Sequence, residues 1–105
     1  MTSTDKHGAA TFEIQDGERS RVLGTLHFST VSALLGVGSD AIEAGRAAVI
    51  DLSTVAESDS SGLALLIEWL SIAKSADRPL KYENIPSQIK QLAVLSEVED
   101  LLTGT

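Results

Sequence analysis

Residues 49–66, VIDLSTVAESDSSGLALL, run from an apolar segment through a polar one into a second apolar segment. The first apolar segment begins two residues before the quoted stretch and covers residues 47–55. It is short and apolar on both faces, which is typical of a central strand in a parallel sheet. The second continues with apolar residues at helical spacing, which predicts a helix over Ser60–Ser75. A buried strand followed by such a helix indicates an α/β fold with right-handed crossovers.

The residues before this unit predict a hairpin and a helix. Residues 11–26 contain two short strand-like segments around Asp16-Gly17, a dipeptide favoured in hairpin turns. From Ser29 the apolar residues recur at helical spacing, and Ser29 or Thr30 is the expected N-cap. The hairpin therefore adds an antiparallel strand at the edge of the sheet.

The residues after the unit predict one more strand and two helices. Residues 79–85 form the strand, Pro86 opens a helix that runs through Leu95, and residues 96–102 form a last short helix. The expected order is β-β-α-β-α-β-α-α, with a mixed sheet of roughly four to five strands and about three to four helices.

Length and composition indicate a single domain that folds without cross-links. The chain has 105 residues, of which 43% are hydrophobic, and it contains no cysteine. Disulfides, thiolate metal sites and cysteine nucleophiles are therefore excluded. We expect the domain over residues 11–102, with a flexible segment at residues 1–10 and a frayed end at residues 103–105.

Charge and hydropathy limit the class of partner. The formal net charge of -7 disfavours nucleic acid and anionic lipid surfaces, because both attract basic proteins. No apolar stretch approaches the ~20 residues of a membrane span, and the N-terminal residues lack the profile of a signal peptide. The sequence predicts a cytoplasmic protein, and its charge does not disfavour binding to another protein.

The helix over Ser60–Ser75 carries more apolar surface than a single core stripe needs. Leu65 and Trp69 lie on a flank beside that stripe. In one interpretation neighbouring helices cover them. In the other they receive a partner, because tryptophan is enriched among the residues that anchor protein interfaces.

The polar residues before this helix also have two interpretations. Ser58, Asp59 or Ser60 is a typical N-cap. Ser60 is also a candidate switch, because a helix N-terminus favours negative charge and would tolerate a phosphate. Gly62 follows in the first turn, where either a partner's backbone or the tight turn itself accounts for a glycine.

The sequence does not favour an enzyme. Asp51, Glu57 and Asp59 are the carboxylates that Mg²⁺ or acid–base chemistry would use, but no further acidic pair follows the first strand. His7 lies in the expected flexible N-terminal segment, and His27 has no carboxylate or serine at motif spacing. No phosphate-binding loop of the Walker type is present. We expect a protein without catalytic residues, metal or cofactor.

VIDLSTVAESDSSGLALL resembles the central strand, loop and helix start of STAS domains, the fold of anti-sigma-factor antagonists. The D-L-S element falls on Asp51–Ser53 and the D-S-S-G-L element on Asp59–Leu63, and the predicted elements fit the STAS layout. The resemblance implies a protein-binding module in which Ser60 is the candidate phosphorylation site.

A narrower resemblance is to the MlaB family, the STAS subunits of ABC transporters that move phospholipids between the membranes of Gram-negative bacteria. It is carried by GTLHFSTVSALL (24–35), GLALLIEWLSIAK (62–74) and RPLKYENIPSQIKQLAVLSEVEDLL (78–102). It implies a non-catalytic subunit, peripheral to the inner membrane, that supports an MlaF-like ATPase in complex with its permease. The partner surface that it implies is Asp59, Ser60 and Ser61, and to these the wide apolar arc adds Leu65 and Trp69.

The alternative function is an anti-sigma factor antagonist controlled by phosphorylation of Ser60, with an anti-sigma serine kinase as its partner. DSSG is the form of the motif that such kinases phosphorylate in this family. The helix continues as ALLIEWL, however, without the glycine and arginine expected of many members of the sigma pathway. This difference favours the transporter subunit.

Overall fold

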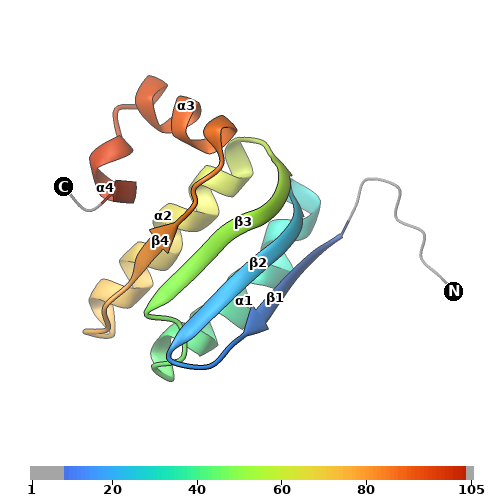
Figure 1. The fold of residues 1–105 in the computed structure, drawn as a ribbon. Helices are drawn as coiled ribbons and strands as arrows, with labels where there is room; N and C mark the ends of the chain where they lie inside the picture. Colours follow the sequence, from blue (N-terminus) through green and yellow to red (C-terminus); the bar gives the residue numbers. More distant parts are fainter. Residues whose placement is uncertain (1–8, 104–105) are drawn as a thin grey trace, which may run out of the picture.

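The computed structural model describes residues 9–103, which form a four-stranded sheet and four helices (Figure 1). The predicted fold class and order of elements are confirmed. The elements are β1 Ala10–Ile14, β2 Arg19–Leu26, α1 Phe28–Glu43, β3 Val49–Ser58, α2 Ser60–Ser75, β4 Lys81–Glu83, α3 Ser87–Leu95 and α4 Glu99–Thr103.

The strands lie in the order β1-β2-β3-β4 across the sheet. β1 pairs with β2 as an antiparallel hairpin, and Asp16 and Gly17 lie in the turn between them, as predicted. β2, β3 and β4 are parallel. Their carboxyl ends therefore meet at one edge of the sheet, where the helices begin and where α/β proteins place their binding sites.

α1 and α2 cover one face of the sheet (Figure 1). Most strand residues on that face are apolar and buried, as Val22 on β2 and Ile50 and Leu52 on β3 illustrate. Ser20 on β2 is buried as well, and its hydroxyl donates to the Arg46 carbonyl at 3.1 Å. The alternate residues Arg21 and Asp51 lie on the opposite face and remain partly exposed. This alternation follows from the two-residue period of a strand and gives the sheet one dry and one wet face.

Several boundaries differ from the sequence expectation. β3 begins at Val49 instead of residue 47, and α4 begins at Glu99 instead of residue 96. β3 continues to Ser58, because its pairing with β2 extends as far as Leu26 and Ser58. β4 is shorter than expected, since only Lys81–Glu83 pair with β3. Pro86 is the N-cap of α3 rather than its first helical residue.

The predicted N-cap of α1 was wrong. α1 begins at Phe28, and His27 is its N-cap. The His27 Nδ1 accepts a hydrogen bond from the Ser29 N–H at 3.3 Å, and the Thr30 Oγ1 accepts one from the His27 N–H at 3.1 Å. Thr30 therefore takes the reciprocal role of a capping box instead of the cap itself.

Most of the two expected flexible ends, residues 1–8 and 104–105, lie outside the described residues. Ala10 belongs to β1 and Thr103 to α4, so regular structure reaches one residue further at each end than expected. None of the helices found between residues 9 and 103 has the length and apolar character that crossing a bilayer requires.

Candidate partner-binding site at the start of α2

The loop from β3 into α2 is held to its neighbours by backbone hydrogen bonds. The Asp59 N–H donates to the Leu26 carbonyl of β2 at 3.0 Å, and the Ser58 N–H donates to the Gln88 Oε1 of α3 at 3.1 Å. Asp59 is the N-cap of α2, and its Oδ1 accepts the Ser61 N–H at 2.7 Å. These bonds fix the position of the first turn of α2 before any partner binds.

Ser60 and Ser61 begin α2 at the surface. Ser60 is exposed, and within residues 9–103 its hydroxyl makes no hydrogen bond. Ser61 is half-buried, while Asp59 beside it is exposed. The structure thus brings together Asp59, Ser60 and Ser61, the residues of the expected partner surface, at the carboxyl edge of the parallel strands.

Gly62 is explained by packing within the chain. A Cβ at this position would overlap the Ser58 hydroxyl and lie 3.1 Å from the Leu26 Cβ. Gly62 therefore lets the first turn of α2 rest directly on the ends of β2 and β3. Of the two interpretations, the tight first turn accounts for this glycine without a partner.

The wide apolar arc of α2 is covered by neighbouring elements, because α2 contacts α1, α3 and α4 as well as the sheet. Trp69 is 0% exposed, and its Nε1–H donates to the Leu35 carbonyl at 3.3 Å. Its indole fills the space over Gly38, and the Phe12 ring packs edge-on against it with the ring centroids 5.6 Å apart. This changes the expected role of Trp69, which offers no side-chain surface to a partner. Leu65 is 4% exposed and stays at the surface of a groove.

That groove lies between α1 and α2 and has a volume of about 340 Å³. α1 contributes Val31, Ser32 and Leu35 to its walls, and α2 contributes Ser61, Ala64, Leu65 and Glu68. Most of its accessible surface is apolar. The groove could not be predicted from the sequence, because its existence depends on how two helices are placed side by side.

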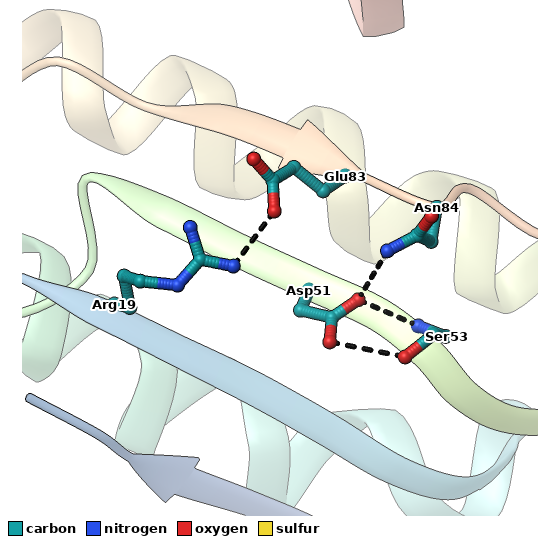
Figure 2. Close-up of polar contacts among 5 residues, drawn as sticks. All are labelled: Arg19, Asp51, Ser53, Glu83 and Asn84. Atoms are coloured by element: carbon teal, nitrogen blue, oxygen red, sulfur yellow. Dashed lines mark hydrogen bonds and ion pairs between the residues drawn. The ribbon is translucent and has the colours of Figure 1, made fainter.

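A second polar cluster lies on the wet face of the sheet (Figure 2). Asp51 accepts hydrogen bonds from the Ser53 N–H and hydroxyl, both at 3.0 Å, and from the Asn84 side chain at 2.9 Å. The Asn84 bond is the main cause that lowers the pKa of Asp51. Arg19 pairs with Glu83 at 2.7 Å, and this hydrogen bond lowers the pKa of Glu83. These contacts brace the parallel strands.

The three carboxylates of the enzyme hypothesis are not gathered into one site. Asp51 is held in the cluster of Figure 2, whereas Glu57 lies near the other end of β3 and Asp59 follows the strand as the N-cap of α2. Asp51 and Glu57 are six positions apart along β3, which corresponds to roughly 20 Å. Over residues 9–103 no group of three or more histidine, aspartate or glutamate side chains is arranged to hold a metal ion.

Two solved structures share this fold. The anti-sigma factor antagonist SpoIIAA in its unphosphorylated form has a TM-score of 0.64 and 18% identity, with 85% of this chain and 83% of that chain covered. SpoIIAA in its phosphorylated form, described as a Bacillus cell fate determinant, has a TM-score of 0.64 and 18% identity, with 85% and 84% covered. At this identity the likeness shows the fold alone.

The class of protein is a STAS domain. A family model described as "Mlab, STAS domain" matches residues 14–103, and the chain belongs to this family. The comparison with curated proteins finds no match.

Proposed function

We propose that this chain is a non-catalytic STAS subunit that binds and supports the ATPase of an ABC phospholipid transporter, and that the complex maintains outer-membrane lipid asymmetry. The family match over residues 14–103 is the observation that carries this proposal. In this function the chain is cytoplasmic and lies at the inner membrane through its partner, an MlaF-like ATPase in complex with its permease.

The start of α2 suits a contact with such a partner. Asp59, Ser60 and Ser61 are accessible, and the bonds to β2 and α3 hold them in place. A prearranged surface loses little conformational entropy on binding. The small Ser60 side chain also lets a partner approach the helix closely, so added bulk or charge there disrupts the contact.

An anti-sigma factor antagonist is the second candidate. The accessible hydroxyl of Ser60 favours it, as does the fold shared with SpoIIAA, which has been solved in unphosphorylated and phosphorylated forms. A phosphate on Ser60 would stand next to the Asp59 carboxylate, which already accepts the Ser61 N–H. Repulsion between these charges opposes the gain from the helix N-terminus.

A tagged pull-down from the native host tests both functions. Wild type, Ser60→Glu and Ser60→Trp are compared, so that charge and bulk are separated. Ser75→Glu is the matched control, since Ser75 is an exposed serine on the same helix, about 22 Å away along its axis. All variants should unfold at the wild-type temperature, because both serines are exposed.

The transporter function predicts that wild type and Ser75→Glu recover an ABC ATPase with its permease, and that both Ser60 variants lose it. If both Ser60 variants recover the ATPase and permease as wild type does, the start of α2 is not part of the contact with the ATPase. Recovery of an anti-sigma serine kinase, together with phosphate on Ser60 in mass spectra, replaces the transporter function with the signalling one.

A further inference from the structure

On α1, an exposed aromatic side chain extends the row of residues that lines the groove, although it is not itself part of the lining. Phe28, Val31, Ser32 and Leu35 follow the spacing i, i+3, i+4, i+7 and therefore share one face of α1. Phe28 lies one turn beyond Val31 and has 78% of its surface exposed. Phenylalanine is among the aromatic residues that are enriched in protein interfaces, so an exposed ring in line with an apolar groove suits a binding anchor.

α2 forms the other wall with a row of the same spacing. Ser61, Ala64, Leu65 and Glu68 occupy positions i, i+3, i+4 and i+7. Seven residues of helix correspond to about 10 Å, or two turns. The groove is thus about two helical turns long. The small side chains of Ser61 and Ala64 on α2 leave the space between the two helices unfilled.

The walls determine which kind of segment fits. Both walls are α-helices, whose backbone groups are bonded within each helix, so they offer no main-chain partners to an added β-strand. A helix brings its own backbone hydrogen bonds and presents side chains at the spacing of the two walls. The groove therefore favours a helix over an extended peptide.

Charge specifies the polar part of that helix. Among the described residues that line the groove, Glu68 carries a charge and no lysine or arginine is present. Asp59, also acidic, caps α2 beside Ser61 at the other end, and the chain as a whole carries a net charge of -7. The complementary partner segment is basic, because opposite charges steer association and fix the register of docking.

We propose that this groove, with Phe28 as its anchor, receives an amphipathic helix of the ATPase partner. The helix has apolar side chains at the spacing i, i+3 or i+4, i+7, and a lysine or arginine that meets Glu68. The inference rests on the proposed function, since it takes the helix to belong to the ATPase. Ser61 lines the groove and adjoins Ser60, so both contacts form one continuous surface.

The test uses the ATPase–permease complex that the wild-type chain recovers, purified and titrated with variants of this chain. Phe28→Ala removes the anchor, and Val37→Ala is its control, an apolar residue 50% exposed on the opposite side of α1. Glu68→Lys reverses the groove charge, and Glu43→Lys reverses an exposed charge at the end of α1. Equal thermal unfolding temperatures show that all four variants are folded.

We expect Phe28→Ala and Glu68→Lys each to weaken binding about tenfold or more, and both controls to stay within about twofold of wild type. A photocrosslinker at the exposed Ala64 should attach to a helical peptide of the ATPase that contains lysine or arginine, whereas one at Ala33, exposed outside the groove, should not. Changing that basic residue to glutamate should restore binding of Glu68→Lys.

The failures are distinguishable. Wild-type binding by both groove variants, with loss of binding in Ser60→Glu, overturns the groove proposal and leaves the proposed function intact. If wild type recovers no ABC ATPase, the proposed function and the groove proposal both fail. If wild type is a dimer that Phe28→Ala converts to a monomer, a second copy of this chain occupies the groove and the proposal is overturned.

Discussion

The two ends of the α1–α2 interface differ although the same pair of helices forms both. Towards their carboxyl ends, Gly38 of α1 lies directly against the Trp69 indole, and no space remains between the helices. Towards their amino ends, α2 faces α1 with the small side chains of Ser61 and Ala64 beside Leu65, and a groove remains. The side-chain volume at a few positions thus decides that one end of the helix pair belongs to the hydrophobic core and that the other end is open to the surface.

The largest expected effect is at the closed end. Trp69→Ala removes a wholly buried indole, its hydrogen bond to the Leu35 carbonyl and its contact with Phe12. We expect a loss of ~3–5 kcal/mol in the free energy of unfolding, measured by urea denaturation.

Phe28→Ala is the control for this comparison, because it truncates an aromatic side chain at the open end of the same interface. It should change the free energy of unfolding by less than about 0.5 kcal/mol. Equal losses in the two variants would show that the two ends of the interface do not differ as the structure indicates.

This comparison also separates what the sequence predicts from what it does not. The bounds of α2, Ser60–Ser75, were predicted correctly, because a strong apolar period and a polar cap mark them within the helix itself. The burial of Trp69 depends on Gly38, a residue 31 positions earlier on another helix. In the sequence Gly38 is only a residue that weakens its own helix.

The candidate site shows the same limit. The motif around Ser60 is local, so the sequence identifies it together with Asp59 and Ser61. The groove requires two rows on separate helices to face each other, although the spacing of Phe28, Val31 and Leu35 is a signal for one of them. The His27 cap was missed because histidine is not among the residues usually preferred at that position.

A smaller effect is expected where the core side of α2 meets the sheet. The Tyr82 hydroxyl donates to the Leu66 carbonyl at 2.6 Å, and both residues are buried. Tyr82→Phe should lower the free energy of unfolding by roughly 1–2 kcal/mol at neutral pH, as measured by urea denaturation. An unchanged free energy of unfolding would mean that the hydrogen bond between Tyr82 and the Leu66 carbonyl does not stabilise this side of α2.

The same residue predicts a pH dependence. Burial raises the pKa of Tyr82 well above its usual value, because the phenolate would lose its hydration. The neutral hydroxyl therefore contributes stability that is fully present below the unfolded pKa of about 10 and is lost as the pH rises above it. Tyr82→Phe should reduce this alkaline loss. Tyr82 is the chain's single tyrosine, so tyrosinate absorbance reports its ionisation directly.

The smallest of the three effects is expected at the mouth of the groove. Asp59→Ala removes the N-cap bond to the Ser61 N–H and should cost ~1 kcal/mol in the free energy of unfolding. Asp59→Asn keeps an oxygen acceptor and should recover most of this loss, whereas Ser60→Ala removes no hydrogen bond within residues 9–103 and should be nearly neutral.

Urea denaturation of these three variants separates stability from recognition at adjacent residues. If Ser60→Ala costs as much as Asp59→Ala, Ser60 stabilises the helix start, and its accessibility no longer supports a role in binding. If Asp59→Ala alone is destabilising, and Ser60→Glu still abolishes recovery of the partner, then Asp59 holds the first turn of α2 in place and Ser60 is the residue that the partner contacts.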